Sequence, residues 1–239
     1  MANKKVSTPI TAILWSFLQR GGGISISFIS NMILARLLIP EDFGIIGLIL
    51  VFTSLADTLV DAGLGSALIQ KKSISKQDIS TVFTSNIIIS VILFGILFLT
   101  APYIADYVSV EGFDLYLRVQ LLTVLLRALY VVEFSLMNRN LRFKDLAKIN
   151  VIASLLSVSL AITFAFMGYG VWSIIIKNIS LQIILVFLYK YYNKVVLDFK
   201  FNKKTFLELF SFGGYVSLTY FLDFVYNNLI ILIMGKNYS

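Results

Sequence analysis

The chain of 239 residues is 58% hydrophobic and only 14% charged, and it contains neither Cys nor His. Soluble domains carry about 25% charged residues, so this composition excludes an ordinary soluble domain and indicates an integral membrane protein. The lack of Cys and His also excludes disulfides, thiolate metal sites and catalysis by either residue type.

Seven long apolar segments, separated by polar breaks, follow one another along the chain. Each reaches or approaches the roughly 20 residues that a helix needs to cross the hydrocarbon core, and none shows the alternation of a membrane-spanning strand. The sequence therefore predicts an all-α integral membrane protein, a polytopic helix bundle. The segments are residues 12–38, 43–69, 80–108, 113–137, 146–167, 171–189 and 206–234.

The net charge of +7 is distributed unevenly between the breaks. Fourteen Lys and Arg residues precede the first segment or lie in or near the second, fourth and sixth breaks, whereas three lie near the first and third breaks and at the C-terminal end. Cytoplasmic loops of membrane proteins carry the excess of Lys and Arg. The distribution predicts a cytoplasmic N-terminus, and it accounts for the basic charge without a nucleic-acid partner.

Ionisable residues inside the segments are the candidate functional residues. A rise of 1.5 Å per residue places Arg20, Asp57, Asp61 and Arg127 in one layer, about 12–18 Å from the cytoplasmic end. Asp57 and Asp61 lie on one helix face because they are four residues apart. Such groups usually face a bundle interior or a wet cavity, so one interpretation is a polar cavity with both charges in its wall. In the other, the arginines pair with the aspartates only to hold helices together.

Three further features allow both a functional and a structural interpretation. Lys177 and Asp223 are isolated charges, with no other charged residue near them in their segments. The three glycines at 21–23, directly after Arg20, either make the first helix bendable or let it pack closely on a neighbour. Residues 63–66, with the sequence GLGS, resemble part of a serine-nucleophile motif, but a chain without His favours packing through small residues.

Five motifs, in order over nearly the whole chain, resemble those of bacterial oligosaccharide flippases. They are residues 35–44 (ARLLIPEDFG), 61–71 (DAGLGSALIQK), 101–105 (APYIA), 140–144 (NLRFK) and 168–173 (GYGVWS). The chain is similar to Wzx-type polysaccharide exporters of the MOP superfamily, which also contains the lipid II flippase and the MATE transporters. The residues that carry the first two motifs are Arg36, Pro40, Asp42, Gly44, Gly63 and Gly65.

The resemblance implies a fold of two six-helix lobes around a central cationic cavity. Residues 1–204 would form one MOP/MATE-like lobe, and residues 205–239 would be the first helix of an incomplete second lobe. Because such transporters have about twice as many helices as this chain, we expect a fragment, a truncated gene product or a cloned piece.

The resemblance also implies the function. A family member would move an undecaprenyl-diphosphate-linked oligosaccharide from the cytoplasmic to the periplasmic leaflet of the bacterial inner membrane by alternating access, for surface polysaccharides such as the O-antigen of lipopolysaccharide. Arg20, Arg127 and Lys177 would hold the substrate, since arginine offers phosphate a bidentate fork that stays charged. Asp57, Asp61 and Asp223 would line the polar cavity or couple transport to H⁺ or Na⁺.

No cofactor, metal or enzymatic activity is expected, and the expected partners are membrane lipids, the lipid-linked oligosaccharide, a polysaccharide polymerase and a chain-length regulator. Three other interpretations stay open. An integral-membrane polymerase or glycosyltransferase would be expected to have a large external loop with catalytic acids or arginines, whereas the external breaks here are short. A truncated, non-functional remnant has the same sequence pattern. A MATE-type exporter has the same fold around an apolar or acidic cavity.

Overall fold

The structure is a computed structural model. It describes the backbone of residues 9–61, 63–193 and 198–237, and the side chains of residues 15, 21–61, 63–193, 198–224 and 226. Helices and their connections account for all of the described backbone, in which no strand occurs. The helices are α1 (Pro9–Leu37), α2 (Pro40–Asp61), α3 (Leu64–Gln70), α4 (Lys76–Val108), α5 (Phe113–Gln120), α6 (Leu122–Ala128), α7 (Val131–Arg139), α8 (Phe143–Phe166), α9 (Val171–Asn193) and α10 (Lys203–Asn237).

The predicted class, an all-α polytopic membrane protein, is confirmed. Within the described residues four helices, α2, α4, α8 and α9, are long and apolar enough to cross a membrane. The helices from α5 to α7 make a fifth span if their bent pair counts as one, and Gly21–Leu37 of α1 is a shorter apolar helix.

Two of the predicted segments are not single helices, which corrects the sequence-based expectation. The segment at 43–69 is divided into α2 and α3, because Gly63 adopts a φ of 68° that ends the right-handed path. The segment at 113–137 is divided into α5, α6 and α7, with a 42° bend before α7. Tyr130, at that bend, has φ −130° and ψ −7°, outside helical geometry. No Gly or Pro marks this second break.

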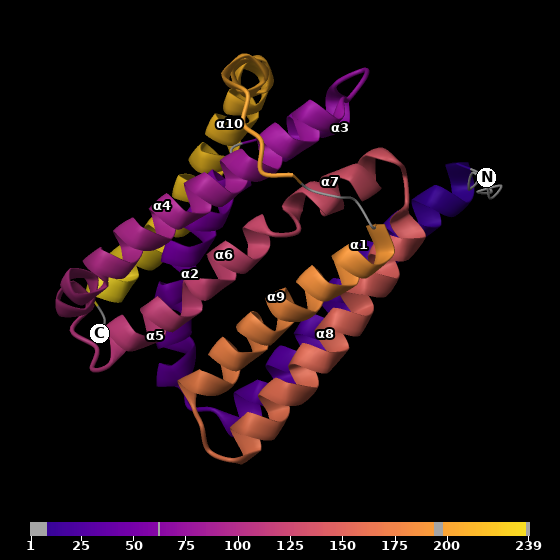
Figure 1. Cartoon of the computed structure of the whole chain (residues 1–239). Helices are drawn as coiled ribbons and strands as arrows, with labels where there is room; N and C mark the ends of the chain where they lie inside the picture. The colour runs from indigo at the N-terminus through magenta and orange to yellow at the C-terminus, as the bar shows by residue number, and fades with distance from the viewer. Residues whose placement is uncertain (1–8, 62, 194–197, 238–239) are drawn as a thin grey trace.

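The helices form two groups that meet along α6, α7 and α9 (Figure 1). In one group α8 packs between α1 and α9. In the other, α10 packs against α2, α3 and α4, while α4 also contacts α2, α5 and α6. The largest apolar core joins the two groups, because it contains Ile49 of α2, Leu117 of α5 and Ile175 of α9, all fully buried.

Local sequence signals account for the ends of several helices. Pro40 is the first residue of α2, where its fixed φ and missing N–H cost nothing, and Asp42 accepts a hydrogen bond from the Ile39 N–H at 3.2 Å. Ser75 and Asp78 form a complete capping box at the start of α4. The glycines at 21–23 do not interrupt α1, and a Cβ on Gly22 would lie 3.6 Å from Val151 of α8, an ordinary van der Waals contact.

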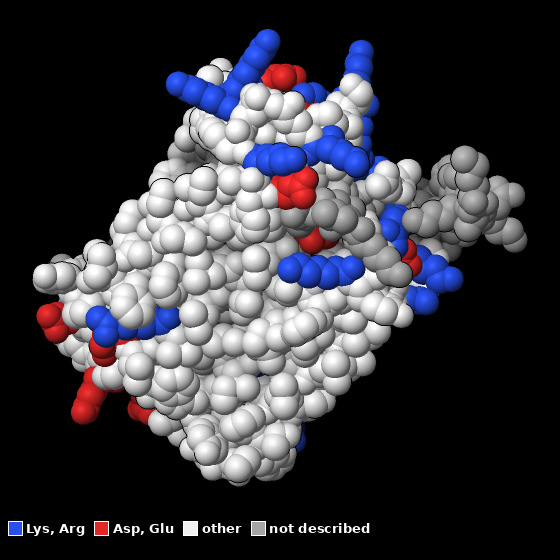
Figure 2. All heavy atoms as spheres, in the orientation of Figure 1, with Lys and Arg blue, Asp and Glu red and all other residues white. Residues whose placement is uncertain are grey.

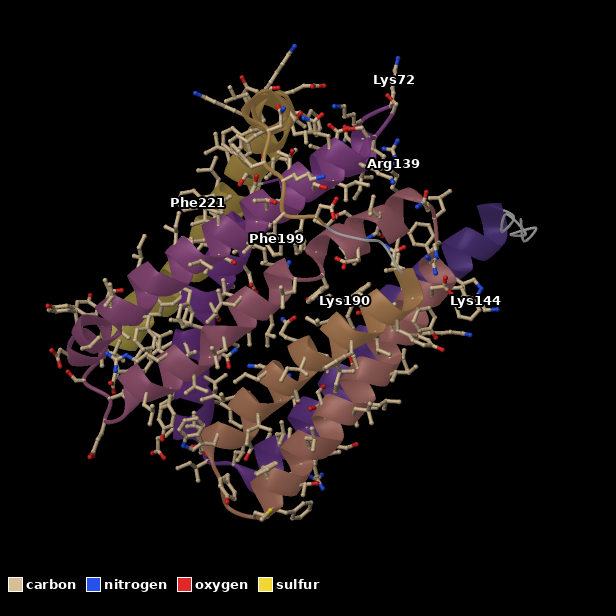
Figure 3. The ribbon with its side chains drawn as sticks, in the orientation of Figure 1. Lys72, Arg139, Lys144, Lys190, Phe199 and Phe221 are labelled. Atoms are coloured by element: carbon tan, nitrogen blue, oxygen red, sulfur yellow. The ribbon has the colours of Figure 1, made fainter. Side chains whose placement is uncertain are left out.

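Charges gather at opposite ends of the bundle. Figure 2 shows Lys and Arg along its upper edge and mostly Asp and Glu at its lower left. We call the first the basic end; it holds the connections that precede α4 and α8, where Lys72, Arg139 and Lys144 lie in or beside them, with Lys190 of α9 nearby (Figure 3). The acidic end holds the connections α1–α2, α4–α5 and α8–α9. This separation of charge matches the asymmetry that the sequence predicts.

Candidate functional site

An ion pair between α6 and α2 forms the centre of the candidate site. The Nη1 atom of Arg127 lies 3.6 Å from Oδ2 of Asp57, so the structure brings together two of the four charges that the sequence places in one layer. Both side chains are partly open, with exposed fractions of 38% for Arg127 and 24% for Asp57. The pair is therefore neither sealed in the core nor on the outer surface.

This ion pair leaves hydrogen-bonding capacity unused. Nε of Arg127 and Oδ1 of Asp57 are buried atoms with no hydrogen-bond partner in the described structure. Guanidinium offers five N–H donors, and a buried donor without a partner costs about 1–3 kcal/mol. The single 3.6 Å contact is also longer than a charge-assisted hydrogen bond, which measures about 2.7–2.9 Å. The guanidinium thus retains donors for an anion such as a phosphate.

Asp61 has a different role in the structure from Asp57. Its Oδ1 accepts a hydrogen bond of 3.0 Å from the Gly65 N–H, so Asp61 holds the first turn of α3 after the break. A Cβ on Gly65 would lie 2.6 Å from both Asp61 Oδ1 and Ser135 Oγ, so α3 packs closely on α7 and these two side chains would have to move to admit a larger residue. The charge of Arg127 also acts on Asp61, which keeps both aspartates in the same electrostatic cluster.

Aromatic and amide side chains extend the cluster toward α9. The rings of Tyr130 and Tyr189 stack with centroids 5.0 Å apart and an interplanar angle of 5°. The Tyr130 hydroxyl donates a hydrogen bond of 2.7 Å to Oε1 of Gln182. Arg127 interacts electrostatically with both tyrosines, so the cluster that includes Arg127 joins α2, α6 and α9.

The other predicted substrate and cavity residues are Arg20, Lys177 and Asp223. Arg20 lies on α1, and its side chain is outside the described residues. Lys177 is half-buried on α9 and forms no ion pair with any residue that the structure describes. Asp223 is exposed on α10. Their proposed roles in substrate binding or coupling stay predictions.

The residues of the first motif, 35–44, lie at the acidic end of the bundle. Arg36 is exposed in the last turn of α1, where a positive charge complements the helix dipole. Gly44 is exposed and has open space beside it. A Cβ on Gly170, which has φ 50°, would lie 3.1 Å from Oδ1 of Asp42. The first and fifth motifs, far apart in the sequence, thus meet at this end of the bundle.

The second motif, residues 61–71, contains the break between α2 and α3. A Cβ on Gly63 would lie 1.9 Å from the carbonyl oxygen of Gly213, so α10 approaches the break backbone to backbone. Packing through small residues, as the sequence predicts for positions 63–66, is confirmed.

Arg139 fixes the basic end in a way that the sequence does not reveal. Its guanidinium donates hydrogen bonds of 2.8 Å to the carbonyl oxygens of Leu68 and Ile69 and one of 2.9 Å to that of Lys72. Leu68 and Ile69 lie in the last turn of α3, and Lys72 follows that helix. One charged side chain of α7 therefore satisfies carbonyl acceptors that the short helix leaves open. The sequence shows Arg139 only as one of several loop cations.

Glu133 is buried, although it lies close to the cytoplasmic end of the predicted segment 113–137. A long side chain near such an end can reach water. In the structure it is 1% exposed on α7, and its Oε2 has no hydrogen-bond partner among the described residues. The fold of the broken segment buries it, and no local sequence signal predicts that break.

Comparisons with known proteins place the chain in a family. A family model described as "Polysaccharide biosynthesis protein" matches residues 33–239. The succinoglycan biosynthesis transport protein ExoT of Rhizobium meliloti is 29% identical over 67% of this chain and 33% of its own length. The teichuronic acid biosynthesis protein TuaB of Bacillus subtilis is 25% identical over 77% of this chain and 38% of its own.

The lipopolysaccharide biosynthesis protein WzxC of Escherichia coli is 22% identical over 95% of this chain and 46% of its own length. The chain thus spans between a third and a half of these curated relatives. No solved structure matches it. Since the family model covers most of the chain, the chain belongs to the polysaccharide biosynthesis protein family, which comprises Wzx-type polysaccharide flippases.

Proposed function

We propose that the protein takes part in moving a lipid-linked oligosaccharide across the bacterial cytoplasmic membrane during the synthesis of a surface polysaccharide. The observation that carries this proposal is the partly open ion pair between Arg127 and Asp57 within the bundle. A charged group at this depth is costly unless it serves a pathway or a partner. The names of the relatives, which refer to succinoglycan, teichuronic acid and lipopolysaccharide, support a glycan substrate.

In this proposal the diphosphate that joins lipid and glycan binds at Arg127. Arginine matches phosphate oxygens with a planar, permanently charged fork, and 38% of the Arg127 side chain is exposed. Asp57 would hold the guanidinium while the site is empty and would release part of it when the phosphate arrives. Gln182 of α9, which is half-buried and accepts the hydrogen bond of Tyr130, offers an amide of the kind that sugars contact.

The proposed orientation places the basic end in the cytoplasm. The positive-inside rule supports it, because the basic end holds the connections rich in Lys and Arg. The same orientation puts the N-terminus in the cytoplasm and the acidic end in the periplasm. Labelling of single cysteines with a membrane-impermeant reagent checks this orientation, which would be wrong if Glu111→Cys were labelled only from the cytoplasmic side.

Depletion of the protein in its own cells tests the proposal. We expect lipid-linked oligosaccharide to accumulate in the cytoplasmic leaflet while surface polysaccharide falls, because synthesis continues and transfer stops. The two quantities are measured as the fraction of lipid-linked glycan accessible from outside and as total surface glycan. Unchanged values for both after complete depletion would contradict the proposal, and restoration by the intact gene is the control.

A further inference from the structure

A lysine at the basic end bridges α10 and the rest of the bundle. The Nζ atom of Lys71, directly after α3, lies 3.1 Å from Oδ1 of Asp78 on α4 and 2.9 Å from Oε1 of Glu208 on α10. One ammonium group therefore connects three helices. Glu208 is far from Lys71 along the chain, and the flippase motifs of the sequence include Lys71 without either of its partners.

The two halves of this bridge differ in how firmly they are held. Asp78 is 7% exposed and belongs to the capping box with Ser75, so its carboxylate is fixed by the hydrogen bonds of that box. Glu208 has an exposed fraction of 61%. An exposed ion pair contributes little and exchanges readily with water, so the contact to α10 is the one that breaks first.

The backbone around Lys71 is rigid on the side away from α10. Arg139 donates hydrogen bonds to the carbonyl oxygens of Leu68, Ile69 and Lys72, on either side of Lys71. These hydrogen bonds hold the backbone that carries Lys71 in place while its side chain contacts Glu208. Hydrogen bonding to Glu208, before any other cause, raises the pKa of Lys71 above its usual value, so the bridge stays ionic at physiological pH.

Below the bridge, α10 touches the bundle at a second point. Gly63 and Gly213 approach so closely that a Cβ on the former would lie 1.9 Å from the carbonyl oxygen of the latter. Between the two contacts lies a cavity of about 240 Å³. It is lined by Ala67, Gln70, Lys71, Glu208, Leu209 and Phe212. Beside this cavity Leu209 of α10, which is 3% exposed, packs in one apolar cluster with Ala67 and Leu68 of α3. A tight deep contact, an apolar contact and a loose outer contact thus follow one another along α10, and the outer one is the contact that can open alone.

We propose that Lys71 and Glu208 form a releasable latch that closes the basic end by holding α10 against α3, with the contact between Gly63 and Gly213 as its pivot. This inference rests on the proposed transport function, since a carrier must open to the cytoplasm to receive its lipid-linked substrate. Release of Glu208 leaves Lys71 on Asp78, so the charge of the lysine stays compensated in the open state. The latch therefore opens without leaving an isolated buried charge.

A single reporter cysteine can follow this opening because the chain has no cysteine of its own. Ala67 is 3% exposed and faces the cavity, so the thiol of Ala67→Cys reacts with a membrane-impermeant maleimide only when α10 moves away. The reaction is run on inverted and on right-side-out membrane vesicles. We expect slow labelling in inverted vesicles and none in right-side-out vesicles; labelling from the outside alone would overturn the cytoplasmic placement of the latch.

The neutral variant Glu208→Gln, added to the reporter chain, tests the latch itself. Loss of one exposed ion pair should raise the labelling rate about 1.5- to 5-fold, and 1 M salt should bring the unmodified reporter chain toward the same rate. Glu111→Gln, an exposed acid at the acidic end, is the matched control and should change nothing. Equal labelling rates at low salt for the reporter chain with and without Glu208→Gln, or an equal increase in the control, would overturn the latch.

The variant Lys71→Gln removes both ion pairs and should accelerate labelling at least as much as Glu208→Gln. Because Glu208 is exposed, the Glu208→Gln result stands even if Lys71→Gln fails to fold. The labelling rate measures opening without any glycan present. A chain that opens as expected but moves no lipid-linked oligosaccharide would therefore overturn the proposed function and leave the latch intact.

Discussion

Replacing Arg127 by Gln is expected to abolish glycan export while the protein remains in the membrane. The substitution removes the charge and the planar fork that we propose for diphosphate binding. Hydrogen bonds to a charged group contribute about 1.5–3 kcal/mol each, which corresponds to roughly a 10- to 150-fold loss of affinity. Arg127→Lys keeps the charge and loses the fork, so we expect intermediate export. The measurement is surface polysaccharide together with the fraction of lipid-linked glycan accessible from outside.

Two further variants separate this effect from a loss of stability. Arg127→Gln alone leaves the partly buried Asp57 without its cation, which can destabilise the fold. The double variant Arg127→Gln with Asp57→Asn removes both charges, so it should fold and still fail to export. Arg118→Gln at the acidic end, where the arginine pairs with Asp114 at 3.5 Å, is the control and should export normally. Normal export by the double variant would contradict the assignment of Arg127.

Replacing Gly63 by Ala is expected to destabilise the fold strongly. The residue has φ 68°, a conformation that costs other L-residues about 1–2 kcal/mol, and the new Cβ would lie 1.9 Å from the carbonyl oxygen of Gly213. Relief of that overlap requires a shift of α10, at a cost of about 1–3 kcal/mol. We therefore expect the free energy of unfolding in detergent to fall by about 2–5 kcal/mol.

A glycine without these constraints gives the matched control for that substitution. Gly95 lies inside α4 with open space around its Cβ position and no positive φ. Gly95→Ala should therefore leave stability unchanged or raise it by up to about 1 kcal/mol. If Gly63→Ala and Gly95→Ala unfolded at the same temperature, the close contact between the α2–α3 break and α10 would not stabilise the molecule.

The sequence predicts the apolar segments, the class of the protein and the separation of charge, because all three follow from local composition and from the positions of Lys and Arg. It also predicts the layer that holds Asp57 and Arg127, because helical rise converts sequence position into depth. The pairing of these two residues between α2 and α6 agrees with that layer.

Other features depend on packing between distant segments and have no local signal. The bend before Val131 contains neither Gly nor Pro, and it determines that Glu133 is buried instead of reaching water. The contact between Lys71 and Glu208 joins residues that are far apart in the sequence. Gly63 is predicted only in part. Its sequence context indicates close packing, but it does not indicate that Gly213 is the partner.

Binding of the substrate at Arg127 is the central claim, and thermal unfolding of the purified chain with lipid-linked oligosaccharide tests it most directly. We expect the diphosphate-linked compound to raise the unfolding temperature of the unmodified protein, since a ligand that binds the folded state stabilises it. We expect little or no rise for the double variant Arg127→Gln with Asp57→Asn, and little for the unmodified protein with the same lipid and glycan lacking the diphosphate. An equal rise in the unmodified protein and the double variant would contradict the account.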